Sequence, residues 1–81
     1  MAVERFSEGE KVEVIYEKAM HFGEIGTLKR VGTRPLSMIE FGVTLRTMYF
    51  WVVEFIDKGV KVTEEFTWHE GLPQFPLRKV I

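Results

Sequence analysis

Two histidines are the side chains of this sequence best suited to acid–base or metal chemistry. His21 and His69 each have glutamates within a few positions along the chain. Neither belongs to an i, i+4 histidine pair on a helix, or to another spacing typical of zinc sites. We therefore expect both to be loop histidines, with no metal site, no cofactor and no catalytic role.

The sequence also lacks the motifs of nucleophilic and phosphate-binding sites. Ser7 and Ser37 lie outside a Gly-x-Ser-x-Gly context, and there is no cysteine. The stretch 23–26, GEIG, continues a predicted strand instead of opening a helix, so it forms no phosphate cradle. Glu64 and Glu65 would point to opposite faces of a strand, which makes them poor partners in acid–base catalysis. An enzyme acting as a monomer is therefore not favoured, and no catalytic residue is assigned.

Charge is nearly balanced, with 11 basic and 12 acidic residues and a formal net charge of −1. This balance disfavours nucleic acid as a partner, because phosphate binding depends on a basic surface. A local basic patch stays open as an alternative, and its candidates are Lys29, Arg30, Arg34, Arg78 and Lys79.

Composition also bears on the compartment. The absence of cysteine fits a reducing cytoplasm. The longest apolar run, Met48 to Val53, is too short to span a bilayer, and residues 1–10 lack the layout of a signal peptide. We therefore expect a cytoplasmic protein without a membrane partner.

The stretch from Met48 to Val62 predicts a buried hairpin around which the other elements are arranged. Large apolar residues alternate along it, polar Glu54 falls on the opposite parity, and Asp57-Lys58-Gly59 interrupts the run. Gly59 is expected to take the positive φ of the turn. The residues predicted to point inward are Tyr49, Trp51, Val53 and Phe55. The aromatic residues predicted for the core are Tyr49, Trp51, Phe55 and Phe66.

Two strands are predicted before this hairpin. The first runs from Lys11 to Tyr16, with Val12, Val14 and Tyr16 inward. Residues 17–22 then predict an ordered loop or a single helical turn. The second strand is predicted over residues 24–31, and apolar residues spaced three apart around Gly26 indicate a bulge or sharp bend there.

A long segment separates the second strand from the hairpin. Residues 32–35, GTRP, predict a break, after which apolar residues alternate again between Ser37 and Leu45. We expect 37–45 to form an additional strand or ordered arm that hairpins with the next strand around Arg46-Thr47. The alternative is a mobile binding loop.

Four segments carry a family resemblance: GEKVEVIY at 9–16, GEIGTLKRV at 23–31, VVEFIDKG at 52–59 and PLRKVI at 76–81. Together they resemble the small SH3-like barrels of the KOW and Tudor type. The resemblance implies an all-β chain with residues 1–81 as a single SH3-like domain. It would be an antiparallel barrel of five to six strands, with a long, partly stranded insertion between strands 2 and 3. The chain departs from the pattern in that insertion and in Lys58, which is inserted into the Asp-Gly turn.

The C-terminal third is harder to place in such a barrel. Glu64 shares the inward parity of its apolar neighbours, and a lone buried carboxylate is costly. A bulge at Glu64-Glu65 that resets the register is therefore predicted, with Glu64 at the barrel rim as the alternative. Residues 67–76 contain a glycine and two prolines, and they predict a turn or 3₁₀ element before a last short strand. Leu77 and Val80 are expected to attach that strand to the barrel.

Aromatic residues outside the predicted core suggest a binding role. Loop aromatics and a histidine are the candidate ligand- or partner-binding residues: Phe22, Trp68, His69 and Phe75. Trp68 has the alternative role of closing the barrel end. The inward assignment above also turns Met48, Phe50 and Val52 outward beside Ile15, as an apolar strip that needs a cover.

We therefore expect a homodimer in which this strip faces its copy, unless residues 37–45 cover it within one chain. The predicted self-association residues are Ile15, Ile39, Phe41, Met48, Phe50 and Val52. The first function hypothesis is a non-enzymatic interaction module or small accessory subunit that binds a protein partner. The resemblance implies a second, nucleic-acid binding, with Tyr49 or Trp68 stacking on bases. The third is an oligomeric enzyme with its site between subunits.

Overall fold

The computed structural model describes residues 6–36, 46–72 and 74–80. This part of the chain is all-β, with no helix and one antiparallel sheet in the order β4-β3-β2-β1-β5. The strands are β1 (Lys11–Val14), β2 (Ile25–Leu36), β3 (Arg46–Asp57), β4 (Val60–His69) and β5 (Leu77–Lys79). The predicted all-β class and antiparallel pairing are confirmed.

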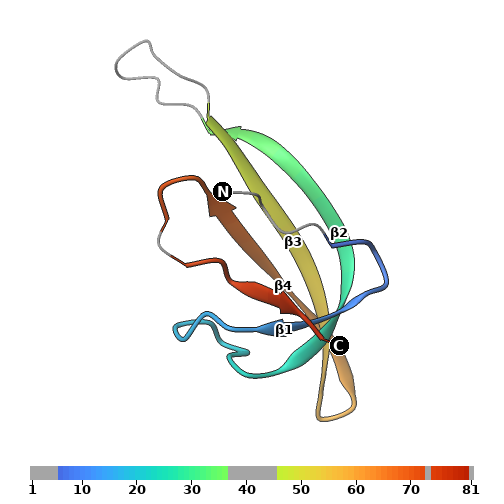
Figure 1. Ribbon diagram of the computed structural model, residues 1–81. Coiled ribbons are helices and arrows are strands. Elements are labelled where there is room, and N and C mark those ends of the chain that lie inside the picture. Colours follow the sequence, from blue (N-terminus) through green and yellow to red (C-terminus); the bar gives the residue numbers. More distant parts are fainter. Residues whose placement is uncertain (1–5, 37–45, 73, 81) are drawn as a thin grey trace.

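The sheet bends strongly over one face. In Figure 1, β1 and β5 cross in front of β3 and β4, and the curved β2 connects the two groups of strands. The first residues of β2 pair with β1, and its residues from Thr27 to Leu36 run beside β3. The edge strands β4 and β5 do not pair with each other, so the sheet is open and is not a closed barrel.

The concave face of the bent sheet holds the core. Trp51, Val53 and Phe55 of β3 are buried there, with Tyr49 partly buried beside them, so the predicted inward parity is confirmed. The other buried apolar residues come from the other four strands and from the N-terminal segment: Phe6, Val12, Val14, Leu28, Phe66, Trp68 and Leu77.

The predicted hairpin is formed by β3 and β4, which pair without interruption from Met48 and His69 down to Asp57 and Val60. Its turn residues Lys58 and Gly59 both have positive φ, 52° and 81°. Two positive φ values are the geometry of a type I′ turn, whose twist matches that of paired strands. The inserted lysine is therefore the first central residue of a tight two-residue turn.

Three expectations about β2 and β3 are wrong. The residues 32–35 do not break the strand, since β2 continues to Leu36 and pairs Pro35 with Thr47. A proline is tolerated there because, beyond the short pairing with β1, no described strand lies on the other side of β2. Arg46 and Thr47 consequently lie inside β3 and not in a turn. The irregularity predicted at Gly26 occurs between Leu28 and Arg30 instead.

Gly26 serves close packing instead of a bulge. A Cβ there would lie 2.5 Å from Val53 Cγ1 and 2.7 Å from the Glu54 carbonyl oxygen. Only glycine therefore lets β2 approach β3 this closely. The three-residue apolar spacing around Gly26 therefore accompanies a close contact between β2 and β3.

The remaining boundaries also differ from prediction. β1 ends at Val14, and Tyr16 lies beyond it with 40% of its surface exposed. The β1–β2 connection is a series of turns, as predicted, with the amide of Ala19 donating to the Tyr16 carbonyl and that of Phe22 to the Ala19 carbonyl. β4 includes residues 67–69, which were expected in a turn.

The C-terminal strand is held unevenly. Leu77 is buried as predicted. Val80 is 39% exposed, and its attachment comes from its backbone amide, which donates to the Lys11 carbonyl at 3.3 Å. Residues 37–45, with the predicted extra strand and its Ile39 and Phe41, lie outside the described residues. Among the residues that the structure describes, there is no helix long and apolar enough to cross a membrane.

Candidate interaction surfaces

The convex face of the sheet carries the row Met48, Phe50 and Val52 of β3. Their outward parity is confirmed, because the alternate residues of β3 are the buried ones. Each of the three is only partly exposed. The strip expected to be bare is therefore partly covered by side chains of its own sheet.

Phe50 is the centre of this face, and a glycine and two arginines surround it. Gly32 lies directly opposite on β2, and a Cβ there would approach Phe50 Cζ to 2.6 Å, so the ring lies over the bare glycine backbone. The Arg34 guanidinium carbon is 4.6 Å from the ring centroid and that of Arg30 is 5.9 Å. Both lie within the range of cation–π attraction. Neither arginine's role beside Phe50, nor that of Gly32, was recognised in the sequence.

The neighbours of this ring make the face mixed in character. Arg34 Nη2 is 2.8 Å from Glu65 Oε1, which links β2 across β3 to β4. Val52 pairs with Arg30 and Glu65, and Met48 pairs with Arg34 and His69. We call the residues Arg30, Gly32, Arg34, Met48, Phe50, Val52 and Glu65 the convex patch. It combines apolar surface with charges of both signs.

Ile15 does not join the convex patch. It follows β1, which β2 separates from β3 in the sheet. Its amide donates to the Pro76 carbonyl, and its carbonyl accepts from Gln74 Nε2. Ile15 therefore holds the segment leading into β5, whereas the sequence placed it beside Phe50.

The predicted loop aromatics are divided among different surroundings. Phe22 is 52% exposed on the β1–β2 connection. Trp68 is buried on the concave face, and Phe75 packs on it with ring centroids 5.6 Å apart. His69 ends β4 and pairs with Met48, on the parity opposite to Trp68. The structure brings together Trp68 and Phe75 alone.

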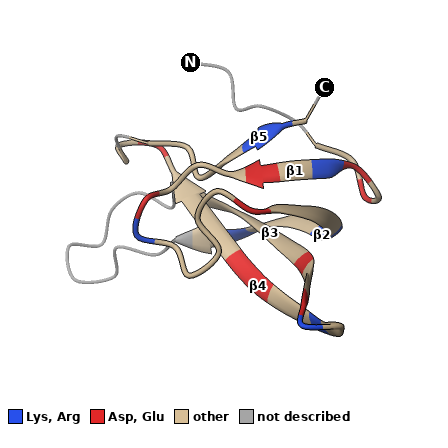
Figure 2. Cartoon of the chain, turned by 90° about the horizontal axis from the view of Figure 1, so that it is seen from below, with Lys and Arg blue, Asp and Glu red and all other residues tan. Residues whose placement is uncertain are grey.

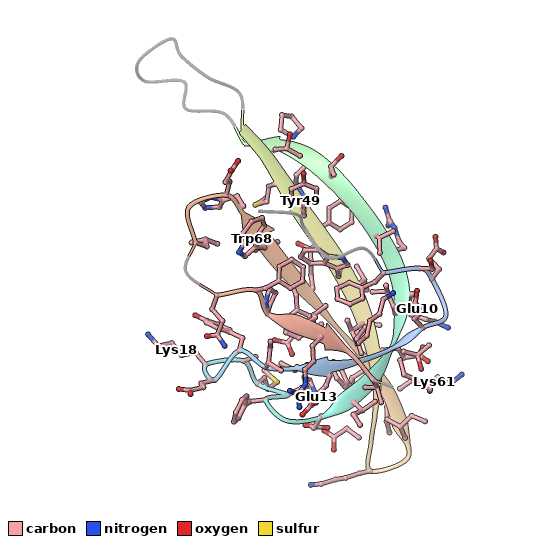
Figure 3. The ribbon with its side chains drawn as sticks, viewed as in Figure 1. Glu10, Glu13, Lys18, Tyr49, Lys61 and Trp68 are labelled. Atoms are coloured by element: carbon pink, nitrogen blue, oxygen red, sulfur yellow. The ribbon has the colours of Figure 1, made fainter. Side chains whose placement is uncertain are left out.

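Trp68 is part of an aromatic cluster at one end of the core. Figure 3 shows it beside Tyr49, where the ring centroids are 6.2 Å apart. Phe75 also contacts Trp51 edge-on at 4.9 Å. The Trp68 indole nitrogen is buried without a hydrogen-bond partner in the described structure. These contacts match the alternative in which Trp68 closes one end of the core.

His21 and Glu64 form a pair that the sequence did not reveal. His21 Nδ1 lies 2.6 Å from Glu64 Oε1, and the imidazole stacks on Phe55 with a centroid distance of 4.2 Å and an interplanar angle of 5°. The bulge predicted at Glu64-Glu65 is absent, since β4 pairs regularly through both residues. Glu64 keeps its inward parity because a histidine from the β1–β2 connection satisfies it. The sequence signal that could have revealed this pair was the inward parity of Glu64 among apolar neighbours, because a buried carboxylate needs a partner.

The five cations of the nucleic-acid alternative do not form one bare patch. All except Arg30 have a carboxylate within ion-pair distance. Arg78 Nη2 is 2.7 Å from Glu13 Oε1, and Lys79 Nζ is 3.8 Å from Glu10 Oε2. Each basic charge near β5 is therefore balanced locally.

The described ranges contain no group of three or more His, Asp or Glu residues placed to hold a metal ion. Comparison with family models, curated proteins and solved structures gave no significant match. The function is therefore inferred from the geometry of the chain itself.

Proposed function

We propose that this protein is a non-enzymatic interaction module, a small accessory subunit that binds a protein partner through the convex patch. The observation that carries the proposal is the position of Phe50 over Gly32 and between two arginines. This ring packs on its own sheet and keeps part of its surface accessible.

The composition of the patch suits a protein partner. Phenylalanine, methionine and arginine are enriched in protein–protein interfaces, where a few such residues carry most of the binding energy. Arg30 has no ion pair among the described residues and is free to meet an acidic group of the partner. Phe22 is a second accessible aromatic residue for the same role.

The fold proposed for this module is the SH3-like barrel. Strands β1 to β4 follow one another as a meander, and β5 returns to pair with β1. This order, together with the strong bend of β2, supports a sheet rolled toward a barrel. We keep the cytoplasm as its proposed location, because the chain contains no cysteine.

Affinity capture from the native host tests the partner proposal. The wild-type chain should retain a defined protein that Phe50→Glu retains at least tenfold less, because a charge replaces the central anchor. Ile56→Glu is the matched control: it lies on the same face of β3, is 71% exposed and is outside the convex patch. Equal capture by both variants would contradict the proposal.

Nucleic-acid binding is the competing function, favoured by the placement of Arg30 and Arg34 on either side of an aromatic ring. Phosphate contacts would give an affinity that falls steeply with added salt, whereas an apolar protein interface would not. Titration of a labelled RNA or DNA oligonucleotide at two salt concentrations separates these functions. Lys29, Arg78 and Lys79 each pair with a carboxylate, so they offer little unpaired positive charge to phosphates, and this favours the protein partner.

A further inference from the structure

β4 is an edge strand of the described sheet. It is 10 residues long and pairs with β3 along its whole length, and no other described strand adjoins it. The backbone bonds between loops and strands in the described chain do not involve residues 60–68. An edge that is regular and uncovered can pair with another strand.

The turn fixes which backbone groups point outward. In a two-residue hairpin the residues next to the turn, Asp57 and Val60, exchange both of their backbone hydrogen bonds. Alternate residues of β4 therefore bond to β3, and the residues between them direct N–H and C=O away from the sheet. The outward-directed residues are Lys61, Thr63, Glu65 and Thr67.

Charge along this edge is arranged unevenly. Figure 2 shows acidic residues in the middle of β4 and a basic residue nearer the turn that begins it. Lys61 and Glu65 belong to the outward-directed set and share the convex face with Thr63 between them. A strand whose two ends differ in charge is complementary to its own antiparallel copy.

We infer that β4 pairs antiparallel with β4 of a second copy of this chain, centred on Thr63. In this register Lys61 lies opposite Glu65 of the second copy on both sides of the two-fold axis, and the two Thr63 residues face each other. Opposite charges and Thr–Thr pairs both stabilise directly opposed positions in a sheet. On the concave face, exposed Val60 meets Phe66 of the second copy.

Neighbouring registers are less favourable. Centring the pairing on Glu64 or on Glu65 places that carboxylate against its own copy, and like charges directly opposite destabilise a sheet. Centring it on Val62 removes both opposite-charge pairs. The inferred dimer shares only Glu65 with the convex patch, where this carboxylate also pairs with Arg34. The dimer places the patches of the two copies on the same side of one continuous sheet.

Sedimentation equilibrium at micromolar concentration tests the inference with Thr63→Pro. Proline removes the N–H at the two-fold axis, but that N–H bonds to no strand within one chain, so the fold should persist. The wild type should be a dimer and Thr63→Pro a monomer of 9.5 kDa. Thr67→Pro is the matched control, because it removes another outward N–H beyond the inferred pairing and should remain a dimer. Circular dichroism confirms that both variants are folded.

Charge reversal tests the register. Lys61→Glu should weaken the dimer roughly tenfold, because two opposite-charge pairs become like-charge pairs. The double variant Lys61→Glu with Glu65→Lys should recover most of that loss. A monomeric wild type, a folded Thr63→Pro dimer, or a double variant no tighter than Lys61→Glu would overturn the inference. A dimer that Phe50→Glu dissociates and Thr63→Pro does not would overturn it in favour of the face-to-face arrangement.

Discussion

Two glycines show how single residues set the distances between strands. A Cβ at Gly26 would meet the Glu54 carbonyl oxygen, whereas a Cβ at Gly32 would meet only the ring of Phe50. Backbone cannot move without displacing a whole strand, but a ring edge can rotate. The two positions therefore differ in how well they tolerate an added side chain, although an added Cβ would make similarly short contacts at both.

Gly26→Ala should lower the free energy of unfolding by about 3 kcal/mol, and Gly32→Ala by about 1 kcal/mol. Urea denaturation followed by circular dichroism measures both. Gly32→Ala should also weaken partner capture, because the displaced Phe50 ring no longer lies between the arginines. Equal destabilisation would show that β2 and β3 adjust more easily than this packing implies.

The His21–Glu64 pair makes a second prediction at this scale. His21→Ala removes the stack on Phe55 and leaves Glu64 without its partner, so the free energy of unfolding should fall by about 2 kcal/mol. His21→Phe keeps a stacking ring and loses only the hydrogen bond. Its cost should be about half as large, measured by the same urea titration. If His21→Phe lowers the free energy of unfolding as much as His21→Ala does, the hydrogen bond to Glu64 dominates over the ring stacking.

At the scale of elements, the β3–β4 turn contains a lysine in a backbone conformation that lysine rarely adopts. Lys58 has a φ of 52°, a value that asparagine adopts far more readily than lysine. Lys58→Asn should therefore raise the free energy of unfolding by about 0.5 kcal/mol. Lys18→Asn, at an exposed residue of the β1–β2 connection without a positive φ, should give no gain, and thermal unfolding of the two variants compares them.

The sequence predicted the elements where one face is apolar and the other polar. Alternation around Trp51 gave the correct hairpin, parity and turn, because a slip of one residue would bury Glu54. The alternation gave no end point for β1 or β4, since strand ends depend on a partner strand. Nor could local signals reveal that Pro35 lies where β2 has one neighbour, or that His21 reaches Glu64 across 43 positions.

For the candidate sites, the sequence predicted the orientation of Met48, Phe50 and Val52 but not what covers them. The cover comes from Arg30 and Arg34 on a strand that was expected to end before Arg34. Similarly, Trp68 was assigned to a loop because the prolines nearby suggested one. An extended β4 places it in the core instead.

At the scale of the whole molecule, the homodimer predicted with Phe50 at its centre remains untested. In that arrangement Phe50→Glu would convert a dimer into a 9.5 kDa monomer at micromolar concentration. Sedimentation equilibrium decides, with Ile56→Glu as the control on the same face. If Phe50→Glu remains a dimer, the convex patch stays free to bind another protein.

The pairing of β5 with β1 joins residues from opposite ends of the sequence. Val12 lies beside Lys79, and Leu77 packs beside Val14 with 1% of its surface exposed. Leu77→Ala should lower the free energy of unfolding by about 3 kcal/mol through the cavity that it creates. Val80→Ala, on an exposed residue, should cost less than about 0.5 kcal/mol.

The same pairing has a consequence for the order of folding. The β3–β4 hairpin closes a turn of two residues, whereas the pairing of β5 with β1 closes a far longer loop at a larger entropic cost. We expect β5 to join after the rate-limiting barrier. Leu77→Ala should then accelerate unfolding and leave the refolding rate nearly unchanged in stopped-flow experiments. A slower refolding limb would instead place the meeting of the two ends of the chain within the folding nucleus.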